Sequence, residues 1–143
     1  MLGKRSPQRG LFDADNLYLD FVGRETFYGF LALNGDRLFS DEQFGSLYCP
    51  DNGRKSVPPG LLARALVLQA HDKVSDEEAV NRARYDMRWK VALGVELESR
   101  PFAKSTFQLF RAQLILNDKP REIFVASLQE AKRCGFLKRK KRS

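Results

Sequence analysis

The sequence predicts an all-α, single-domain protein that folds as a multi-helix bundle. Three observations lead to this fold class. A chain of 143 residues is long enough to bury one core without metals or disulfides. Helix-capping motifs and terminating glycines divide the chain into short helices and leave little room for strands. A composition of 43% hydrophobic and 30% charged residues is typical of a folded, water-soluble domain.

The first 24 residues predict an extended N-terminal arm. Glycines and a proline are scattered through this segment among single apolar side chains. We expect the arm to pack on the rest of the protein through Phe12, Leu17, Tyr18 and Phe21. Residues 25–135 then form the helical domain, and residues 136–143 form a basic tail.

Capping motifs place three helix starts. Ser40-Asp41-Glu42-Gln43 is a capping box with Phe39 and Phe44 as its hydrophobic staple, and the pattern recurs at 75–78 and 105–108. Helix ends are predicted at Gly35, Gly94 and Gly135, and a boundary between two helices at Asn117-Asp118. The expected helices cover 25–33, 40–48, 57–71, 76–85, 87–93, 106–116 and 120–134, with a loop at 49–55. The segment 57–71 is apolar on nearly all sides, which predicts the central, buried helix.

Several function classes are excluded by what the sequence lacks. No apolar run is long enough to span a membrane, and no signal peptide is recognisable, so we expect a cytoplasmic protein. The single histidine, His71, and the two cysteines, Cys49 and Cys134, have neither the spacing of a metal site nor that of a nucleophilic triad. We therefore expect no catalytic residues, no metal and no cofactor in this chain.

Positive charge is concentrated in two regions. The tail contributes five of the net +7 through Lys138, Arg139, Lys140, Lys141 and Arg142. The segment 82–111 carries seven lysines and arginines against three acids. Basic blocks of this kind bind nucleic acid or acidic surfaces without reading sequence. The residues alone favour nucleic-acid binding and leave a helical protein-interaction module as the alternative.

The helix expected at 106–116 is the candidate for reading DNA. A capped helix, a loop and a second capped helix form a helix-turn-helix-like unit, although the linkage is looser than the standard turn. On a helical wheel Phe107, Phe110 and Leu114 form a buried stripe, and Gln108 and Arg111 lie outside it. We expect Arg111 to contact a base, and alanine at either polar position to leave stability nearly unchanged.

Eight short motifs, in order along almost the whole chain, carry a resemblance to a known family. They are QRGLF (8–12), FYGFL (27–31), LYC (47–49), NGR (52–54) with VPP (57–59), LQA (68–70), VSDEEA (74–79), YDMRWKVALG (85–94) and PFAKSTF (101–107) with FR (110–111). Together they resemble the amino-terminal domain of bacterial insertion-sequence transposases of the InsH type. The resemblance implies a helical DNA-binding domain that recognises the terminal repeats of the transposon. It also implies a following RNase H-like domain with a metal-binding Asp-Asp-Glu triad, which we expect to be absent from this chain.

The candidate site therefore consists of residues expected to contact double-stranded DNA. They are Arg54, Arg82, Arg84, Arg88, Lys90, Lys104, Ser105, Thr106, Gln108 and Arg111 in the helical domain and Lys138, Arg139, Lys140, Lys141 and Arg142 in the tail. Mg²⁺ is expected only for the absent catalytic domain. The alternative is a module whose helices form a homodimer or dock the catalytic half of a transposase, without direct readout of sequence.

Overall fold

The computed structural model describes residues 13–44, 47, 50–51 and 55–133. The helices are α1 (Ala14–Leu17), α2 (Leu19–Val22), α3 (Phe27–Leu38), α4 (Pro59–Asp72), α5 (Asp76–Tyr85), α6 (Met87–Leu93), α7 (Lys104–Leu116) and α8 (Asp118–Arg133). A 3₁₀ turn, η1, covers Glu42–Phe44, and two-residue strands, β1 (Pro50–Asp51) and β2 (Lys55–Ser56), pair antiparallel. The all-α, single-domain fold is confirmed, and a small hairpin lies where the sequence predicts a plain loop.

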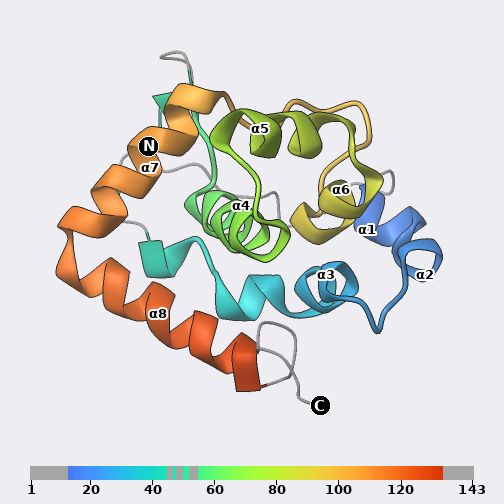
Figure 1. The fold of residues 1–143 in the computed structure, drawn as a ribbon, viewed down its shortest axis with the longest axis horizontal. Coiled ribbons are helices and arrows are strands. Elements are labelled where there is room, and N and C mark those ends of the chain that lie inside the picture. Colours follow the sequence, from blue (N-terminus) through green and yellow to red (C-terminus); the bar gives the residue numbers. More distant parts are fainter. Residues whose placement is uncertain (1–12, 45–46, 48–49, 52–54, 134–143) are drawn as a thin grey trace.

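Helix α4 is the centre of the bundle, as its apolar composition predicts. Figure 1 shows it near the middle of the molecule, with α3, α5, α6, α7 and α8 around it. Its side chains from Leu61 to Ala65 and at Val67 and Leu68 are buried. The core continues through Phe30 of α3, Trp89 of α6 and Phe110 of α7. In the described part of the chain no helix is long and apolar enough to cross a membrane.

Local capping chemistry determines the start of several helices. The side chains of Thr26, Ser75 and Asp86 cap α3, α5 and α6 by accepting backbone N–H groups. The box at Ser40 also forms, because Gln43 and Ser40 exchange side-chain and backbone hydrogen bonds. However, this box starts only the 3₁₀ turn η1, and the rest of the predicted helix falls partly outside the described residues.

The prediction of an extended arm is wrong for residues 13–24, the part of the arm that the structure describes. Residues 14–22 form two short helices, and α1 packs on α6 with Ala14 fully buried. The Ala14 N–H donates to the Val95 carbonyl, which ties this segment to the loop after α6. Leu17 and Phe21 are exposed instead of serving as anchors, and Phe12 lies outside the described residues.

Gly35 does not end α3, which continues to Leu38. A Cβ atom at position 35 would lie 2.5 Å from the guanidinium of the buried Arg64. The glycine therefore leaves room for the Arg64 side chain against α3. Arg64 crosses at this point to the Ala92 carbonyl and to Asp36. In contrast, Gly94 closes α6 in the left-handed conformation, with φ of 69°, as predicted.

The third capping box is also wrong, because α7 begins at Lys104 rather than Thr106. Its N-cap residue is Ala103, so no side-chain hydrogen bond caps the helix. The start is fixed by a hydrophobic staple instead, in which Phe102 stacks on Phe107 with ring centroids 5.1 Å apart. The predicted boundary between α7 and α8 at Asn117 and Asp118 is confirmed.

Candidate nucleic-acid interface

Helix α7 lies at the edge of the molecule and presents one continuous strip to solvent. Its inner side is buried through Phe107, Phe110 and Leu114, and Figure 1 shows the helix along the outer edge of the bundle. The exposed residues that form the outer strip of α7 are Lys104, Ser105, Gln108, Leu109, Ala112, Ile115 and Leu116. The N-terminal part of this strip is mostly polar, and the C-terminal part is apolar.

The first turn of α7 is suited to an anion. No N-cap side chain accepts the backbone N–H groups of its first turn, because the N-cap residue is Ala103. Lys104 and Ser105 are both exposed beside them. A helix N-terminus carries partial positive charge and attracts phosphate. Thr106, which the sequence also predicts as a DNA contact, is buried and does not belong to this surface.

Asp76 organises the polar side chains behind the first turns of α7. Its carboxylate accepts hydrogen bonds from Gln69 Nε2 at 2.8 Å and from Gln108 Nε2 at 3.0 Å. Both terminal nitrogens of Arg111 also donate to it, one at 3.1 Å. The hydrogen bond from Arg111, followed by that from Gln69, holds the pKa of Asp76 well below its ordinary value. These four residues, the Asp76 cluster, connect α4, α5 and α7.

Arg111 is largely committed to this cluster. Besides Asp76, it donates to the side-chain oxygen of Gln69 at 2.9 Å, and its guanidinium lies over the ring of Phe107. Its bidentate fork is therefore occupied inside the protein. This geometry contradicts the expectation that the guanidinium of Arg111 is free to contact a base.

Lys90 is an interior residue, not a surface cation. Its side chain is buried, and its ammonium donates to the backbone carbonyl of Ser99 at 2.7 Å and to the Ser99 hydroxyl at 3.2 Å. Burial, together with the positive charge of Arg84, lowers the pKa of Lys90 to about 8. The expectation that Lys90 contacts DNA is wrong for this conformation, because the amine is enclosed by the loop that leads to α7.

Arg82 and Arg88 are also held by carboxylates. Arg82 bridges Glu78 and Asp72, at 3.0 Å to each. Arg88 forms two hydrogen bonds with Asp86, while its guanidinium lies over the ring of Tyr28. Both arginines are partly accessible to solvent, but each is already paired with a carboxylate of the protein.

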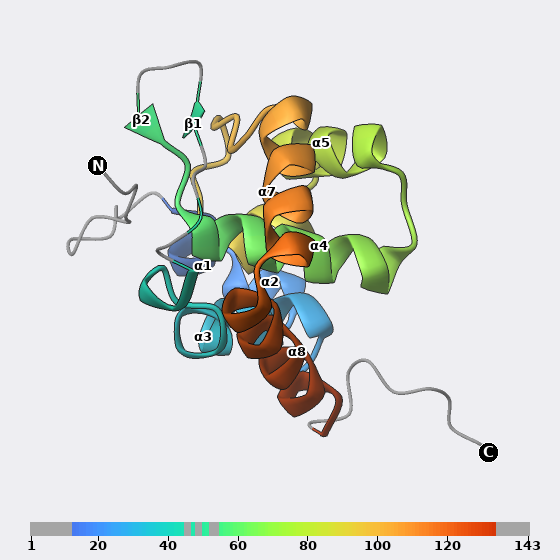
Figure 2. The same cartoon turned by 90° about the vertical axis from the view of Figure 1, so that its left-hand side faces the viewer.

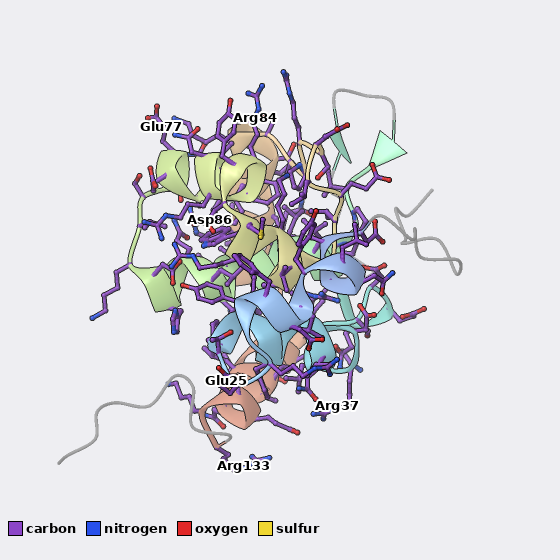
Figure 3. The ribbon with its side chains drawn as sticks, turned by 90° about the vertical axis from the view of Figure 1, so that its right-hand side faces the viewer. Glu25, Arg37, Glu77, Arg84, Asp86 and Arg133 are labelled. Atoms are coloured by element: carbon purple, nitrogen blue, oxygen red, sulfur yellow. The ribbon has the colours of Figure 1, made fainter. Side chains whose placement is uncertain are left out.

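Arg84, Arg100 and Lys104, three basic residues toward the N-terminal end of α7, form no ion pair with a described carboxylate. The guanidinium of Arg84 lies over the exposed ring of Tyr85, 5.0 Å from its centroid. Figure 3 places Arg84 at the end of the molecule that carries α5 and the first turn of α7, and Arg133 at the opposite end. Figure 2 shows the β1–β2 hairpin at the same end as α5.

The excess positive charge of the protein does not lie in the described residues. Nine of the 25 lysines and arginines fall outside them, whereas all 18 acids fall inside. The described part therefore holds 16 basic and 18 acidic residues, a formal net charge of −2. Arg54 and the tail residues Lys138, Arg139, Lys140, Lys141 and Arg142 lie outside the described residues.

The sequence analysis missed the partners of the predicted site residues. Asp72, Asp76 and Gln69 bind three of the predicted contacts, Arg82, Gln108 and Arg111, and none of the three partners is predicted as a site residue. A signal for Asp76 was present, since it follows the capping residue Ser75, but that position indicates only a helix start. In the described residues no group of three or more histidines, cysteines and acids is placed to hold a metal ion.

Apolar side chains form the C-terminal half of the outer strip. Leu109, Ile115 and Leu116 are exposed on α7, the last of them at 79%. Val125 is exposed on α8, which packs against α7. Exposed apolar groups of this size favour contact with another molecule when they are contiguous.

One comparison with known proteins identifies the family. The sequence profile of the transposase domain (DUF772) matches residues 19–113, about two thirds of the chain. This stretch begins at α2 and includes the Asp76 cluster and the first part of α7. No curated protein and no solved structure gives a significant match. The extent of the profile match shows that the chain belongs to the transposase domain (DUF772) family.

Proposed function

We propose that this chain is the DNA-binding N-terminal part of an insertion-sequence transposase and that it recognises transposon ends during DNA transposition. The observation that carries the proposal is the outer strip of α7, where an uncapped helix start, exposed polar side chains and a small residue lie on one accessible face. Membership of the transposase domain family supports a role in transposition. The protein acts in the cytoplasm, on the DNA of the nucleoid.

The proposed binding mode places α7 against the major groove. The groove is wide enough to admit an α-helix, and the N-terminal turns of such a helix reach the base edges. Lys104 and Ser105 then meet a phosphate beside the first turn of α7, where no N-cap side chain makes a hydrogen bond. The helix-turn-helix-like unit predicted from the sequence remains part of this proposal, with α5 packed behind α7.

Long-range attraction to DNA comes from the basic segments in this proposal. Because the described body carries a formal charge of −2, it does not attract a polyanion by net charge. Arg54 and the tail residues Lys138, Arg139, Lys140, Lys141 and Arg142 supply contacts to phosphates that do not depend on sequence. The half-buried Arg84, whose guanidinium lies over the Tyr85 ring, adds to the contact surface, whereas Arg82 and Arg88 serve first in ion pairs within the protein.

Binding measurements on the full chain test this proposal. Fluorescence anisotropy compares duplexes from the two ends of the element that encodes the chain with shuffled duplexes, over a series of salt concentrations. We expect tighter binding to the end duplexes. Lys104→Ala should weaken both kinds of duplex about equally and reduce the log–log salt slope by about 1. Lys132→Ala, an exposed α8 lysine remote from the outer strip, is the control. Equal affinity for end and shuffled duplexes overturns the proposal.

Removal of the tail separates general attraction from recognition. Deletion of Lys138 to Arg142 should weaken binding to end and shuffled duplexes alike and flatten the salt slope by at most about 4–5 units. The preference for the end sequence should persist. A tail deletion that abolishes this preference shows that the tail, and not α7, reads the sequence.

We further propose that this chain alone does not cleave DNA and needs no cofactor. The resemblance to InsH-type transposases implies that cleavage depends on a metal-binding Asp-Asp-Glu triad in a following domain, where the metal ions would activate the reacting oxygens. The purified chain should therefore neither nick nor join end duplexes in Mg²⁺ or Mn²⁺. Metal-dependent cleavage that copurifies with the chain through every column overturns this assignment.

A dimerisation or docking module is the second candidate function, and one observation favours it. Leu109, Ile115 and Leu116 form an exposed apolar face on the same helix. If this face pairs two copies, Leu116→Asp changes the sedimentation of the protein from dimer to monomer and leaves the DNA affinity per protomer unchanged. A chain that sediments as a monomer at all concentrations, while binding end DNA, rejects this candidate.

A further inference from the structure

The orientation of the Gln108 side-chain amide is fixed by its neighbour in the Asp76 cluster. An ionised carboxylate only accepts hydrogen bonds, so the amide nitrogen of Gln108, and not its oxygen, faces Asp76. The amide oxygen and one remaining N–H of Gln108 are thereby left for other partners. In the described chain neither of them has a hydrogen-bond partner, and the residue is exposed on the outer strip of α7.

We propose that Gln108 reads an adenine base in the major groove and that Asp76 is the positioning residue that gives it this preference. The inference rests on the proposed DNA-binding function and deepens it by naming the residue that determines specificity. Adenine presents a donor, its N6 amino group, and an acceptor, N7. The free oxygen and free N–H of the held amide match this pair in one bidentate contact.

The same arrangement discriminates against guanine. Guanine presents two acceptors, O6 and N7, to the major groove. A bidentate contact with both needs two donors, but one N–H of Gln108 is already given to Asp76. The amide oxygen of Gln108 would then face O6 of guanine, acceptor against acceptor. Adenine is therefore favoured because its donor and acceptor both pair with Gln108, and guanine is disfavoured because two acceptors face each other.

The neighbours of Gln108 support its assignment over Arg111. Arg111 shares the cluster, but its two terminal nitrogens are bonded to Asp76 and Gln69. Ala112, one turn after Gln108, is exposed and small enough to let a duplex approach and to contact the methyl group of thymine. The structure thus leaves one polar side chain on this turn with free, oriented hydrogen-bonding atoms.

Selection from a pool of randomised duplexes tests the inference on the full chain. The bound duplexes are sequenced for the wild type, for Gln108→Ala and for Gln129→Ala, the last being an exposed glutamine of α8 that serves as control. The wild type should select a motif that contains adenine at one defined position. Gln108→Ala should lose the preference at that position only, with about 5- to 100-fold weaker binding to the selected duplex. Gln129→Ala should reproduce the wild-type motif.

Two isosteric variants test the role of orientation. Gln108→Glu replaces the amide by an acceptor-only group and should change the preference at this position from adenine to cytosine, whose N4 amino group is a donor. Asp76→Asn should keep its amide oxygen at the Oδ1 position, which accepts from both Gln69 and Arg111. Its amide nitrogen then takes the Oδ2 position toward Gln108, at the loss of the hydrogen bond from Arg111 Nη1. The Gln108 amide then reverses, presents two N–H groups and should prefer guanine. A merely structural role of Asp76 lowers affinity for all duplexes and leaves the preferred base unchanged.

The outcomes separate this inference from the proposed function. If the wild type selects no motif, sequence-specific recognition fails and the inference fails with it. If the wild type selects a motif that Gln108→Ala retains in full, DNA recognition stands and the assignment of Gln108 is overturned. If Gln108→Ala and Gln108→Glu behave as expected but Asp76→Asn still prefers adenine, the positioning role of Asp76 is overturned.

Discussion

Two carboxylates only four residues apart, Asp72 at the end of α4 and Asp76 at the start of α5, gather similar donors for different purposes. The Asp72 side chain is 5% exposed. It accepts hydrogen bonds from three other helices, through Tyr28 Oη at 2.8 Å, Arg82 Nη1 at 3.0 Å and Trp89 Nε1 at 2.8 Å. The Asp76 side chain is 24% exposed and is bonded to Arg111, Gln69 and Gln108.

The difference between the two sites is their access to solvent. Burial of Asp72 raises the pKa of this carboxyl, but hydrogen bonds from His71, Trp89 and Tyr28 outweigh that effect and leave its pKa below the ordinary value. Its partners Tyr28, Arg82 and Trp89 lie on three other helices, so Asp72 fixes α3, α5 and α6 relative to α4. Asp76 keeps one edge open, where an exposed partner is left on the surface. Hydrogen bonds to a carboxylate thus join helices at Asp72, whereas at Asp76 they also hold an exposed side chain, that of Gln108, at the surface.

Removal of the inner carboxylate should have the largest effect on stability. Asp72→Ala leaves the Trp89 N–H, the Tyr28 hydroxyl and one end of Arg82 without their acceptor. We expect the free energy of unfolding to fall by about 3–5 kcal/mol, because removing one member of a buried ion pair leaves the other charge without its partner. Urea denaturation followed by circular dichroism measures it. A loss below about 1 kcal/mol would falsify the view that Asp72 joins the helices.

Lys90 offers a contrasting buried charge, with neutral partners only. Because the pKa of Lys90 is about 8 in the folded protein and near 10.5 in the unfolded chain, the unfolded chain binds more protons between these values. Stability should therefore rise as the pH increases above 8, by about 2 kcal/mol at pH 9.5. Measurement must stop near pH 10, since the pKa of Tyr28, raised to about 12 chiefly by burial, gives the opposite trend at higher pH. Lys90→Met should show no such rise between pH 7.5 and 9.5.

Helix boundaries could be predicted from the sequence where the residues that determine them lie next to the boundary in the chain. The bounds of α5 and α6 are predicted to the residue, because Ser75, Asp86 and Gly94 act within one turn of the helix ends. The error at Gly35 has a distant cause, the Arg64 side chain from another helix. Helix α7 starts early because its staple, Phe102 on Phe107, replaces the expected serine cap.

The candidate site was predicted less well than the fold, for a related reason. The sequence shows which side chains carry charge but not which carboxylate each one meets. Arg111 and Asp76 are 35 residues apart, and nothing in the pattern around either residue indicates the other. The helical wheel correctly separates Phe110 from Gln108, since one is buried and the other exposed. It does not show that Arg111 turns back into the protein.

Arg111→Ala should have an intermediate effect on stability. It removes a charged pair and a bond to Gln69 from a partly exposed site, so we expect a loss of about 1–2 kcal/mol, against the near-zero change expected from the wheel. The lowered pKa of Asp76 adds a pH signature. The ionised Asp76 contributes fully to stability above its pKa in the unfolded chain, about 4. This contribution is lost as the pH falls toward the lower pKa of Asp76 in the folded protein. The stability difference between wild type and variant should therefore narrow below pH 4; a constant difference would assign it to lost packing on Phe107.

Gln108→Ala should have the smallest effect, and this result would sharpen the contrast between the two carboxylates. Gln108 is exposed and gives Asp76 only one of its several hydrogen bonds, so its loss should change the free energy of unfolding by less than about 0.5 kcal/mol. Thermal and urea unfolding of the variant beside Arg111→Ala measure the difference within one cluster. If Gln108→Ala destabilises as much as Arg111→Ala, the outer cluster is structural throughout, like the inner one. If stability is unchanged while binding to DNA is weakened, recognition and stability are divided between two side chains that share a single carboxylate.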